Sequence, residues 1–173
     1  MGSGKSSVGQ ILAALLGWRF VDLDCEIEKA EGRTIREIFS HDGEPRFREM
    51  ETNVLRAVLG DPQRPMVLAA GGGTYVQPRN AELLRAAGAT VVFLEASAET
   101  LLRRCCGEAG ELDAAIRPLA RDREAFMRLY ERRLPLYRTA NFAVVTDSKE
   151  PETVAREIAE KLGLKAGPSL RSG

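Results

Sequence analysis

The chain opens with the stretch Met1-Gly2-Ser3-Gly4-Lys5-Ser6-Ser7-Val8-Gly9, which decides the interpretation of the fold. Glycines allow successive backbone N–H groups to turn inward around phosphate oxygens. The lysine and serine that follow supply a cation and a hydroxyl ligand for Mg²⁺. A helix expected near residues 5–16 adds the positive end of its dipole. The stretch therefore predicts half of a nucleotide phosphate-binding loop, although a flexible, tag-like N-terminus would also be rich in glycine and serine.

The first half of that loop is not among these residues. A complete loop has another glycine five residues before Gly4 and a buried strand before that, and both would precede Met1. Either Met1 is an internal methionine taken for the start, or the chain folds with a gap in its sheet. We favour the first interpretation and expect the sheet formed by these residues to lack its first strand.

The rest of the chain alternates between strand and helix patterns. Short apolar runs rich in β-forming residues occur at 18–21, 66–70, 90–94 and 142–145, with stretches of helical period between them. This alternation predicts a parallel sheet flanked by helices. Helix boundaries are indicated by a possible capping box, by a proline at a helix start and by glycines at helix ends; these residues are Thr34 with Glu37, Pro78, and Gly32, Gly60, Gly88 and Gly163.

Composition excludes several classes of protein. A chain of 173 residues and 19.0 kDa, with 44% hydrophobic and 29% charged residues, is typical of one soluble domain. No apolar run approaches the roughly 18 residues of a membrane span. Twenty-five cations balance 25 anions, which argues against nucleic acid or a membrane surface as the main partner. Three cysteines are too few for a disulfide framework and favour a reducing cytoplasm.

The predicted organisation is a single domain over residues 1–164. Its core comprises 1–104 and 118–164, a mobile lid covers about 105–117, and 165–173 forms a disordered tail. The segment 103–138 contains nine arginines, six acidic residues and no lysine. Coding bias explains most of this arginine excess, but a few of these guanidinium groups suit phosphate and carboxylate.

Two carboxylates follow the first visible strand. Asp22 and Asp24 are spaced i,i+2 and are expected to project into the crevice where α/β sheets bind ligands. One suits a hydrated Mg²⁺ and the other the proton of a reacting hydroxyl. Alternatively, the Asp22-Leu23-Asp24 triplet caps the next helix.

Two further motifs suggest an acceptor site. Arg48 and Glu51 are i,i+3 neighbours on a predicted helix, where the carboxylate would orient the guanidinium toward an anion, although a solvated charged helix has the same pattern. Gly71, Gly72 and Gly73 follow a strand and would expose backbone N–H groups to a ligand, unless they form a plain flexible turn.

Taken together, these motifs resemble shikimate kinase from Gly2 to about Leu162. The motifs are GSGKSSVG, DLD, FSHDGEPRFREME and AAGGGT, followed by Arg117-Pro118-Leu119 and Arg133-Leu134-Pro135-Leu136-Tyr137, in the family's order and approximate spacing. The resemblance implies an α/β P-loop kinase fold with a parallel sheet of order 2-3-1-4-5, strand 1 missing or truncated here, flanked by helices and carrying a small lid. It also implies ATP-dependent phosphorylation of the shikimate 3-hydroxyl, a step in aromatic amino-acid biosynthesis, by a cytoplasmic monomer that uses Mg²⁺.

The resemblance also implies residue roles. Asp24 would hold the shikimate hydroxyls and act on the 3-hydroxyl proton, and Arg48 and Arg133 would hold the carboxylate with help from Gly72. Lys5 and Arg117 would stabilise the transferring phosphate. The other implied residues line the acceptor pocket (Phe39, Phe47, Glu51, Gly71, Gly73), ligate Mg²⁺ (Ser6, Asp22) or contact adenine (Arg104, Pro151, and Lys149 through its backbone).

The sequence also has features of other classes of protein. A related kinase such as gluconate kinase is disfavoured by the DGEPRFREME run and the glycine triplet. A non-catalytic nucleotide-binding domain stays open because half of the phosphate loop is missing. A zinc site from Cys25, His41, Cys105 and Cys106 lacks a CxxC spacing, and a Ser-His-Asp hydrolase lacks a nucleophile elbow.

Overall fold

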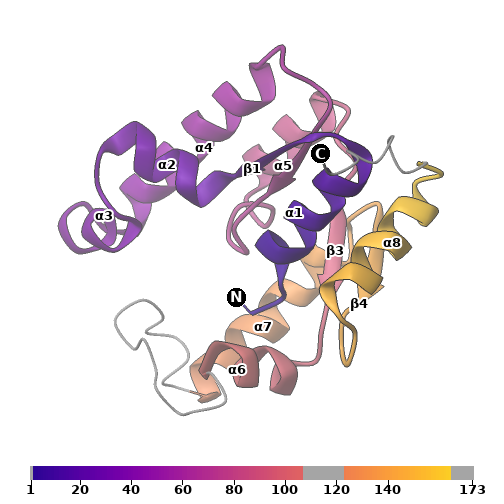
Figure 1. Cartoon of the computed structure of the whole chain (residues 1–173). Helices are drawn as coiled ribbons and strands as arrows, with labels where there is room; N and C mark the ends of the chain where they lie inside the picture. Colours follow the sequence, from indigo (N-terminus) through magenta and orange to yellow (C-terminus); the bar gives the residue numbers. More distant parts are fainter. Residues whose placement is uncertain (1, 107–122, 165–173) are drawn as a thin grey trace.

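The computed structural model describes residues 2–106 and 123–164, with the side chain of Cys106 left out. Helices and strands alternate over most of this part of the chain (Figure 1). In order they are α1 (Lys5–Leu16), β1 (Arg19–Asp22), α2 (Leu23–Glu31), α3 (Ile35–His41), α4 (Gly43–Gly60), β2 (Met66–Ala69), α5 (Pro78–Ala86), β3 (Val92–Glu95), α6 (Ala98–Cys106), α7 (Arg123–Tyr137), β4 (Phe142–Val145) and α8 (Pro151–Lys161).

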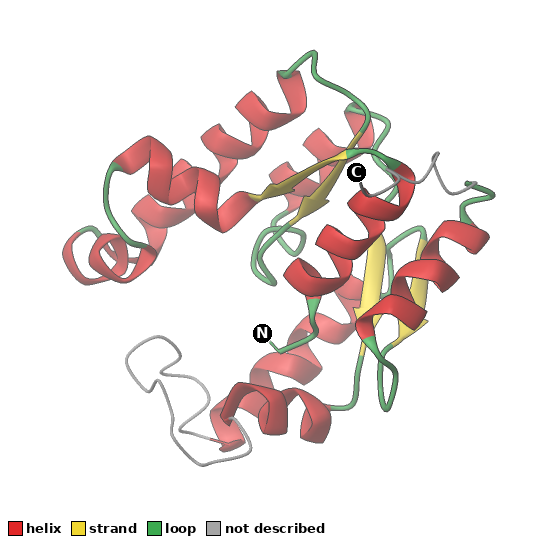
Figure 2. Cartoon of the chain, viewed as in Figure 1, coloured by secondary structure: helices red, strands yellow, loops and turns green. Residues whose placement is uncertain are grey.

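The strands form two parallel pairs rather than one continuous sheet. β1 pairs with β2, with Arg19 opposite Met66, and β3 pairs with β4, with Val92 opposite Phe142. Figure 2 shows the two pairs as separate ribbons. In the family order 2-3-1-4-5, removal of the first strand leaves these same two pairs, so the expected α/β fold with a missing central strand is confirmed for the described residues.

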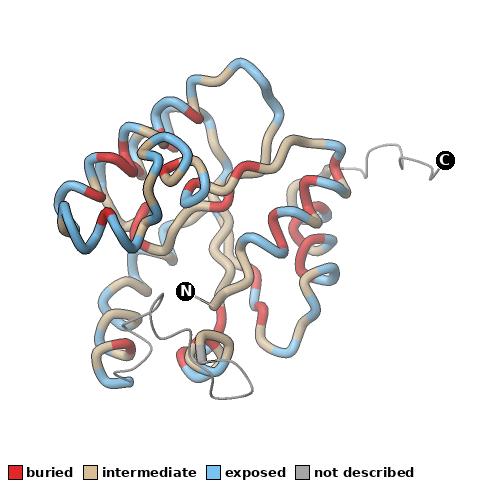
Figure 3. Tube along the Cα trace, turned by 60° about the vertical axis from the view of Figure 1, so that its left-hand side comes forward, coloured by how far each residue is buried: buried red, intermediate tan, exposed pale blue. Residues whose placement is uncertain are grey.

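Helices α1 and α8 cover one face of both pairs. Their apolar sides form a shared core with Val144 of β4, and partly buried residues of β2 and β3 pack against it. The buried positions therefore gather on the facing sides of these two helices (Figure 3). Strand β3, which pairs within the described chain only with β4, keeps all four of its residues half-buried.

The opposite faces are covered by other helices. A second core joins α2, α3, α4 and α5 around Leu23, Ile27, Ile38 and Leu55, and Leu68 of β2 packs against it. A third, smaller core joins α6 to α7. The result is a three-layer arrangement in which the strands are held between helices, as expected for parallel pairs.

Most of the predicted helix boundaries are confirmed. Thr34 and Glu37 form a reciprocal capping box at the start of α3, and Pro78 opens α5. Gly32 caps α2 in the left-handed conformation. The strands match the predicted runs to within about two residues.

One helix runs past a predicted boundary, and another continues through a proline. α6 continues to Cys106, so the first two residues of the predicted lid are helical, and the rest of residues 105–117 lies outside the described chain. α7 continues through Pro135 to Tyr137. The proline removes one backbone donor, but Arg138 still donates to the Leu134 carbonyl at 3.0 Å, so the last turn persists.

None of the described helices is both long and apolar enough to cross a membrane. The predicted tail, residues 165–173, lies outside the described residues, and the single-domain boundaries stay a prediction.

Candidate active site

The phosphate-loop residues lead directly into α1. Gly2 and Gly4 have φ values of 70° and 80°, in the left-handed region that glycine adopts without strain. Gly2 also packs tightly, since a Cβ there would lie 2.8 Å from the carbonyl oxygen of Leu101. Lys5 is the first residue of α1, and Ser6 and Ser7 follow it in the first turn, where backbone N–H groups have no partner within the helix. This geometry suits an anion.

Ser6 and Asp22 meet beside that helix start. The Ser6 hydroxyl donates to Oδ2 of Asp22 at 2.7 Å, while Oδ1 of Asp22 accepts from the backbone N–H of Asp24 at 3.0 Å. Asp22 is therefore the N-cap of α2, as the alternative interpretation proposed, and also the neighbour of Ser6. A hydroxyl and a carboxylate side by side are oxygen ligands of the kind Mg²⁺ takes from proteins, which fits the expected metal pair.

Asp24 links the phosphate loop to the glycine triplet. A Cβ at Gly71 would lie 3.4 Å from Oδ1 of Asp24 and 3.5 Å from Oε1 of Glu51, so both carboxylates border this turn. Although Asp24 is in contact with solvent, partial burial raises the pKa of its carboxyl, and repulsion from Asp22 adds to this. Attraction to Lys5 works in the opposite direction.

This pKa direction predicts the pH dependence of stability. A carboxyl whose pKa is higher in the folded state loses stability as pH rises through the interval between its unfolded and folded values. We expect Asp24→Asn to be more stable than the parent at neutral pH, with the difference vanishing below the ordinary value near 3.8. Thermal unfolding between pH 3 and pH 8 measures it.

Asp61 provides a control of opposite sign. Hydrogen bonds from the Gln63 backbone and from Arg19 lower the pKa of Asp61, so Asp61→Asn should be less stable than the parent at neutral pH. An Asp24→Asn protein that is less stable at neutral pH would contradict the first expectation.

Glu51 is the best-connected acidic residue of the site. Its side chain is 1% exposed and accepts hydrogen bonds from Thr74 Oγ1 (2.6 Å), Gln77 Nε2 (2.6 Å) and Arg48 Nη1 (3.0 Å). The buried carboxylate thus fixes one edge of the Arg48 guanidinium and ties α4 to the loop after β2. The helix pattern of Arg48 and Glu51 is confirmed as an oriented pair rather than a solvated one.

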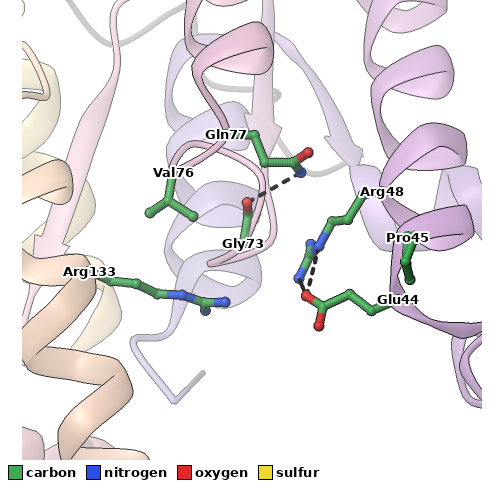
Figure 4. A pocket seen from close by; sticks show the side chains of 7 residues that line it. All are labelled: Glu44, Pro45, Arg48, Gly73, Val76, Gln77 and Arg133. Carbon is green, nitrogen blue, oxygen red and sulfur yellow. Dashed lines mark hydrogen bonds and ion pairs between the residues drawn. The ribbon is translucent and has the colours of Figure 1, made fainter.

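Arg48 lies against Gly73 in a pocket of about 380 Å³. A Cβ at Gly73 would lie 2.7 Å from Cζ of Arg48, so only glycine leaves room for the guanidinium. Arg133 of α7 points into the pocket from the opposite wall (Figure 4). Two guanidinium groups from helices far apart in sequence therefore converge on one pocket, which favours binding of a carboxylate. Glu44, Pro45, Val76 and Gln77 complete its lining.

Tyr137 connects α7 to the glycine triplet. Its hydroxyl donates to the Gly72 carbonyl at 2.6 Å, and its ring stacks on Phe93 of β3 with centroids 5.2 Å apart. Burial raises the pKa of the Tyr137 phenol, with Arg133 opposing. Tyr137 lies one helical turn after Arg133 and so fixes the position of that arginine relative to the turn.

Two aromatic residues predicted for the acceptor pocket pack together. The rings of Phe39 and Phe47 are 4.5 Å apart, and the Arg48 guanidinium lies 5.1 Å from the Phe47 ring centroid. Phe47 is buried, whereas Phe39 is 38% exposed. Phe47 therefore contacts both Phe39 and the Arg48 guanidinium.

The residues predicted to contact adenine lie around the segment after β4. Arg104 donates to the carbonyl and hydroxyl of Thr146, at 2.8 and 3.2 Å, and Pro151 is the first residue of α8. The Lys149 ammonium pairs with Glu157 at 2.6 Å. Its side chain is thus turned toward α8, and a contact of Lys149 with adenine stays a prediction.

Arg117, the predicted lid arginine, lies outside the described residues. Over the described ranges there is no group of three or more potential metal-ligating His, Cys, Asp or Glu residues, and Cys25 is exposed. The zinc interpretation therefore gains no support.

Sequence reasoning assigned no role to Thr74, Gln77, Tyr137 or Glu44. Thr74, Glu44 and Tyr137 were within motifs that carried the resemblance, which was the available signal. No sequence signal marked Gln77, because its contact with Glu51 joins residues 26 positions apart and follows only from the fold.

Comparison with known proteins identifies the family. The sequence profile described as shikimate kinase matches residues 1–163. A shikimate kinase of Persephonella marina is 37% identical over 163 residues, covering 94% of both chains. One from Thermus thermophilus is 43% identical, covering 94% of this chain and 85% of its own. The structure of shikimate kinase from Acinetobacter baumannii in complex with shikimate superimposes with a TM-score of 0.80 at 34% identity, over 94% of this chain and 88% of the other. The chain belongs to the shikimate kinase family.

Proposed function

We propose that this protein transfers the γ-phosphoryl group of ATP to the 3-hydroxyl of shikimate, giving shikimate 3-phosphate and ADP for aromatic amino-acid biosynthesis. The observation that carries the proposal is the convergence of Arg48 and Arg133 on one pocket beside Gly73. Asp24 borders the same glycine triplet and interacts with Lys5 of the phosphate loop. An acceptor carboxylate and the phosphates of ATP would therefore lie on either side of Asp24.

The residue roles follow from this arrangement. The two guanidinium groups would hold the acceptor carboxylate, and Asp24, once ionised, would orient the reacting hydroxyl and take its proton. Lys5 and the N–H groups at the start of α1 would bind the transferred phosphate as its charge spreads. Ser6 and Asp22 would hold Mg²⁺, which would supply neutralisation of phosphate charge. Positioning and electrostatics, rather than covalent chemistry, would account for the rate.

The nucleotide end of the site completes the proposal. Arg104 and Pro151 would enclose adenine and Lys149 would contact it through its backbone, while Arg117 would approach the transferring phosphate from a lid over residues 105–117, with roles taken from the family resemblance. The single-domain organisation over 1–164, the monomeric state and the cytoplasmic location belong to the same proposal. The zero formal net charge supports a small-molecule enzyme over a nucleic-acid or membrane-surface protein.

The direct test is a coupled assay of ADP release from ATP and Mg²⁺ with shikimate or gluconate as acceptor. We expect shikimate-dependent turnover and no gluconate-dependent turnover. Binding of ATP with no turnover on either acceptor would instead support a non-catalytic nucleotide-binding domain, and turnover on gluconate would support the related kinase.

Lys5→Met should separate phosphate chemistry from acceptor binding. Removing one positioned cation from a transferring phosphate costs roughly 100- to 1,000-fold in kcat, so we expect a loss of that size. Shikimate binding, measured without nucleotide, should be unchanged. Lys29→Met, at an exposed lysine paired with Glu26, is the matched control and should keep full activity. A Lys5→Met enzyme that is within a few-fold of the parent would contradict the role of Lys5.

A further inference from the structure

Besides Glu51, a second carboxylate is hydrogen-bonded to Arg48 inside the pocket. Glu44, the second residue of α4, accepts hydrogen bonds through Oε1 from both Nη2 (3.0 Å) and Nε (3.2 Å) of Arg48 (Figure 4). These two donors form one edge of the guanidinium fork, the geometry that binds carboxylates well. Glu44 therefore occupies a place on Arg48 that suits a ligand carboxylate.

The two carboxylates on Arg48 differ in how firmly they are held. Glu51 is 1% exposed and has three side-chain donors, whereas the Glu44 side chain is 62% exposed and, among the described residues, pairs with Arg48 alone. An exposed i,i+4 ion pair contributes little free energy, so Glu44 can leave Arg48 at small cost, while Glu51 cannot.

The position of Glu44 determines the formal charge of the pocket. Arg48 pairs directly with Glu44 and, through Nη1, with Glu51, while Arg133 points into the pocket from the opposite wall. With both carboxylates in place, the formal charges of the two guanidinium groups and the two acids cancel. Once Glu44 swings into solvent, the pocket has one surplus positive charge and a free edge on Arg48.

We infer that Glu44 is an internal competitor for the acceptor's carboxylate and thereby sets the affinity and charge selectivity of the pocket. This inference rests on the proposed function. A ligand with a carboxylate exchanges one charge-assisted pair for another and displaces Glu44. A ligand of the same shape without a carboxylate offers Arg48 no charge-assisted pair in exchange, so it gains nothing from displacing Glu44. Glu44 is thus a specificity-determining residue, and it takes no part in phosphoryl transfer.

The test is calorimetric titration of shikimate, without nucleotide, into the parent, Glu44→Gln and Glu49→Gln proteins. Glu49 pairs with Arg46 at 2.8 Å on the same helix and is 64% exposed, so it is a matched control outside the pocket. We expect Glu44→Gln to lower the Kd for shikimate by roughly two- to five-fold, the fold-change that an exposed ion pair represents. Glu49→Gln should leave the Kd unchanged. The carboxamide analogue of shikimate should not gain affinity in Glu44→Gln.

Other outcomes overturn the inference. An unchanged or higher Kd in Glu44→Gln would mean that Glu44 is inert or positions Arg48 for the ligand. Equal tightening of the carboxamide analogue would mean that the gain is not an exchange of carboxylates. Glu44→Ala, with thermal unfolding of each variant, guards against a local change in α4. Absence of shikimate binding to the parent and to both variants would instead overturn the proposed function.

Discussion

Glu51→Ala is expected to unfold with a free energy about 3 kcal/mol lower than that of the parent and to lose measurable shikimate binding. Removing one member of a buried, hydrogen-bonded ion pair costs about 3–5 kcal/mol, because the remaining charge stays desolvated. The Arg48 side chain retains 22% exposure, which places the expected loss at the lower end. Thr74 and Gln77 would also lose their acceptor. Chemical denaturation and shikimate titration measure the two effects.

Companion variants separate charge from shape at this position. In Glu51→Gln the carbonyl can still accept from Arg48 and the hydroxyl of Thr74 can turn to accept from the amide, so we expect a smaller loss of stability than in Glu51→Ala. Glu49→Ala removes an exposed member of an ion pair from the same helix and should change the free energy of unfolding by less than about 0.5 kcal/mol. Equal destabilisation by Glu49→Ala and Glu51→Ala would show that Glu51 has no special structural role.

The pKa of Arg48 is consistent with this network. Desolvation is the largest single influence and lowers it, but Glu51 and then Glu44 outweigh that effect, so that the pKa is raised overall. The guanidinium therefore stays charged while partly buried. The site holds a permanent cation in a fixed orientation, ready for an anionic acceptor.

Features with a local signature were predictable from the sequence. The capping box at Thr34 needs only residues three apart, and the strand and helix alternation needs only apolar periodicity. The phosphate loop and the glycine triplet are recognisable because glycine is required where the backbone approaches a ligand or another side chain. At Gly73 the structure supplies the reason, since Arg48 fills the space of a Cβ.

Features made by contacts distant in sequence were not predictable. Tyr137 binds the Gly72 carbonyl from 65 positions away, and the motifs that contain these two residues do not indicate that they touch. A proline such as Pro135 favours a helix end when only the sequence is considered, because it removes one backbone donor. In the fold the remaining backbone hydrogen bonds keep α7 helical as far as Tyr137. Glu44 has the spacing of an ordinary surface pair, and only its place in the pocket distinguishes it from Glu49.

Gly73→Ala should abolish tight acceptor binding while leaving the nucleotide end intact. The added methyl group would meet Arg48 within 2.7 Å of Cζ, and the guanidinium, as the far end of a flexible side chain, would move rather than the backbone. Movement breaks the bond to Glu51 and misdirects one of the two groups that hold the carboxylate. We expect the KM for shikimate to rise roughly 10- to 100-fold, in line with the loss of one charge-assisted interaction of about 1.5–3 kcal/mol.

The same substitution elsewhere controls for the loss of glycine itself. Gly60 ends α4 with open space around its Cβ position, so Gly60→Ala should keep the parent KM and match or exceed its stability. In Gly73→Ala the KM for ATP should stay near the parent value, because no phosphate-loop residue lies among the near neighbours of that Cβ. If both KM values rose together, Gly73 would be acting on the whole fold. If neither KM changed, the Arg48 guanidinium would tolerate a methyl group at position 73. The close contact between Gly73 and Arg48 would then not be what positions the two carboxylate-binding arginines.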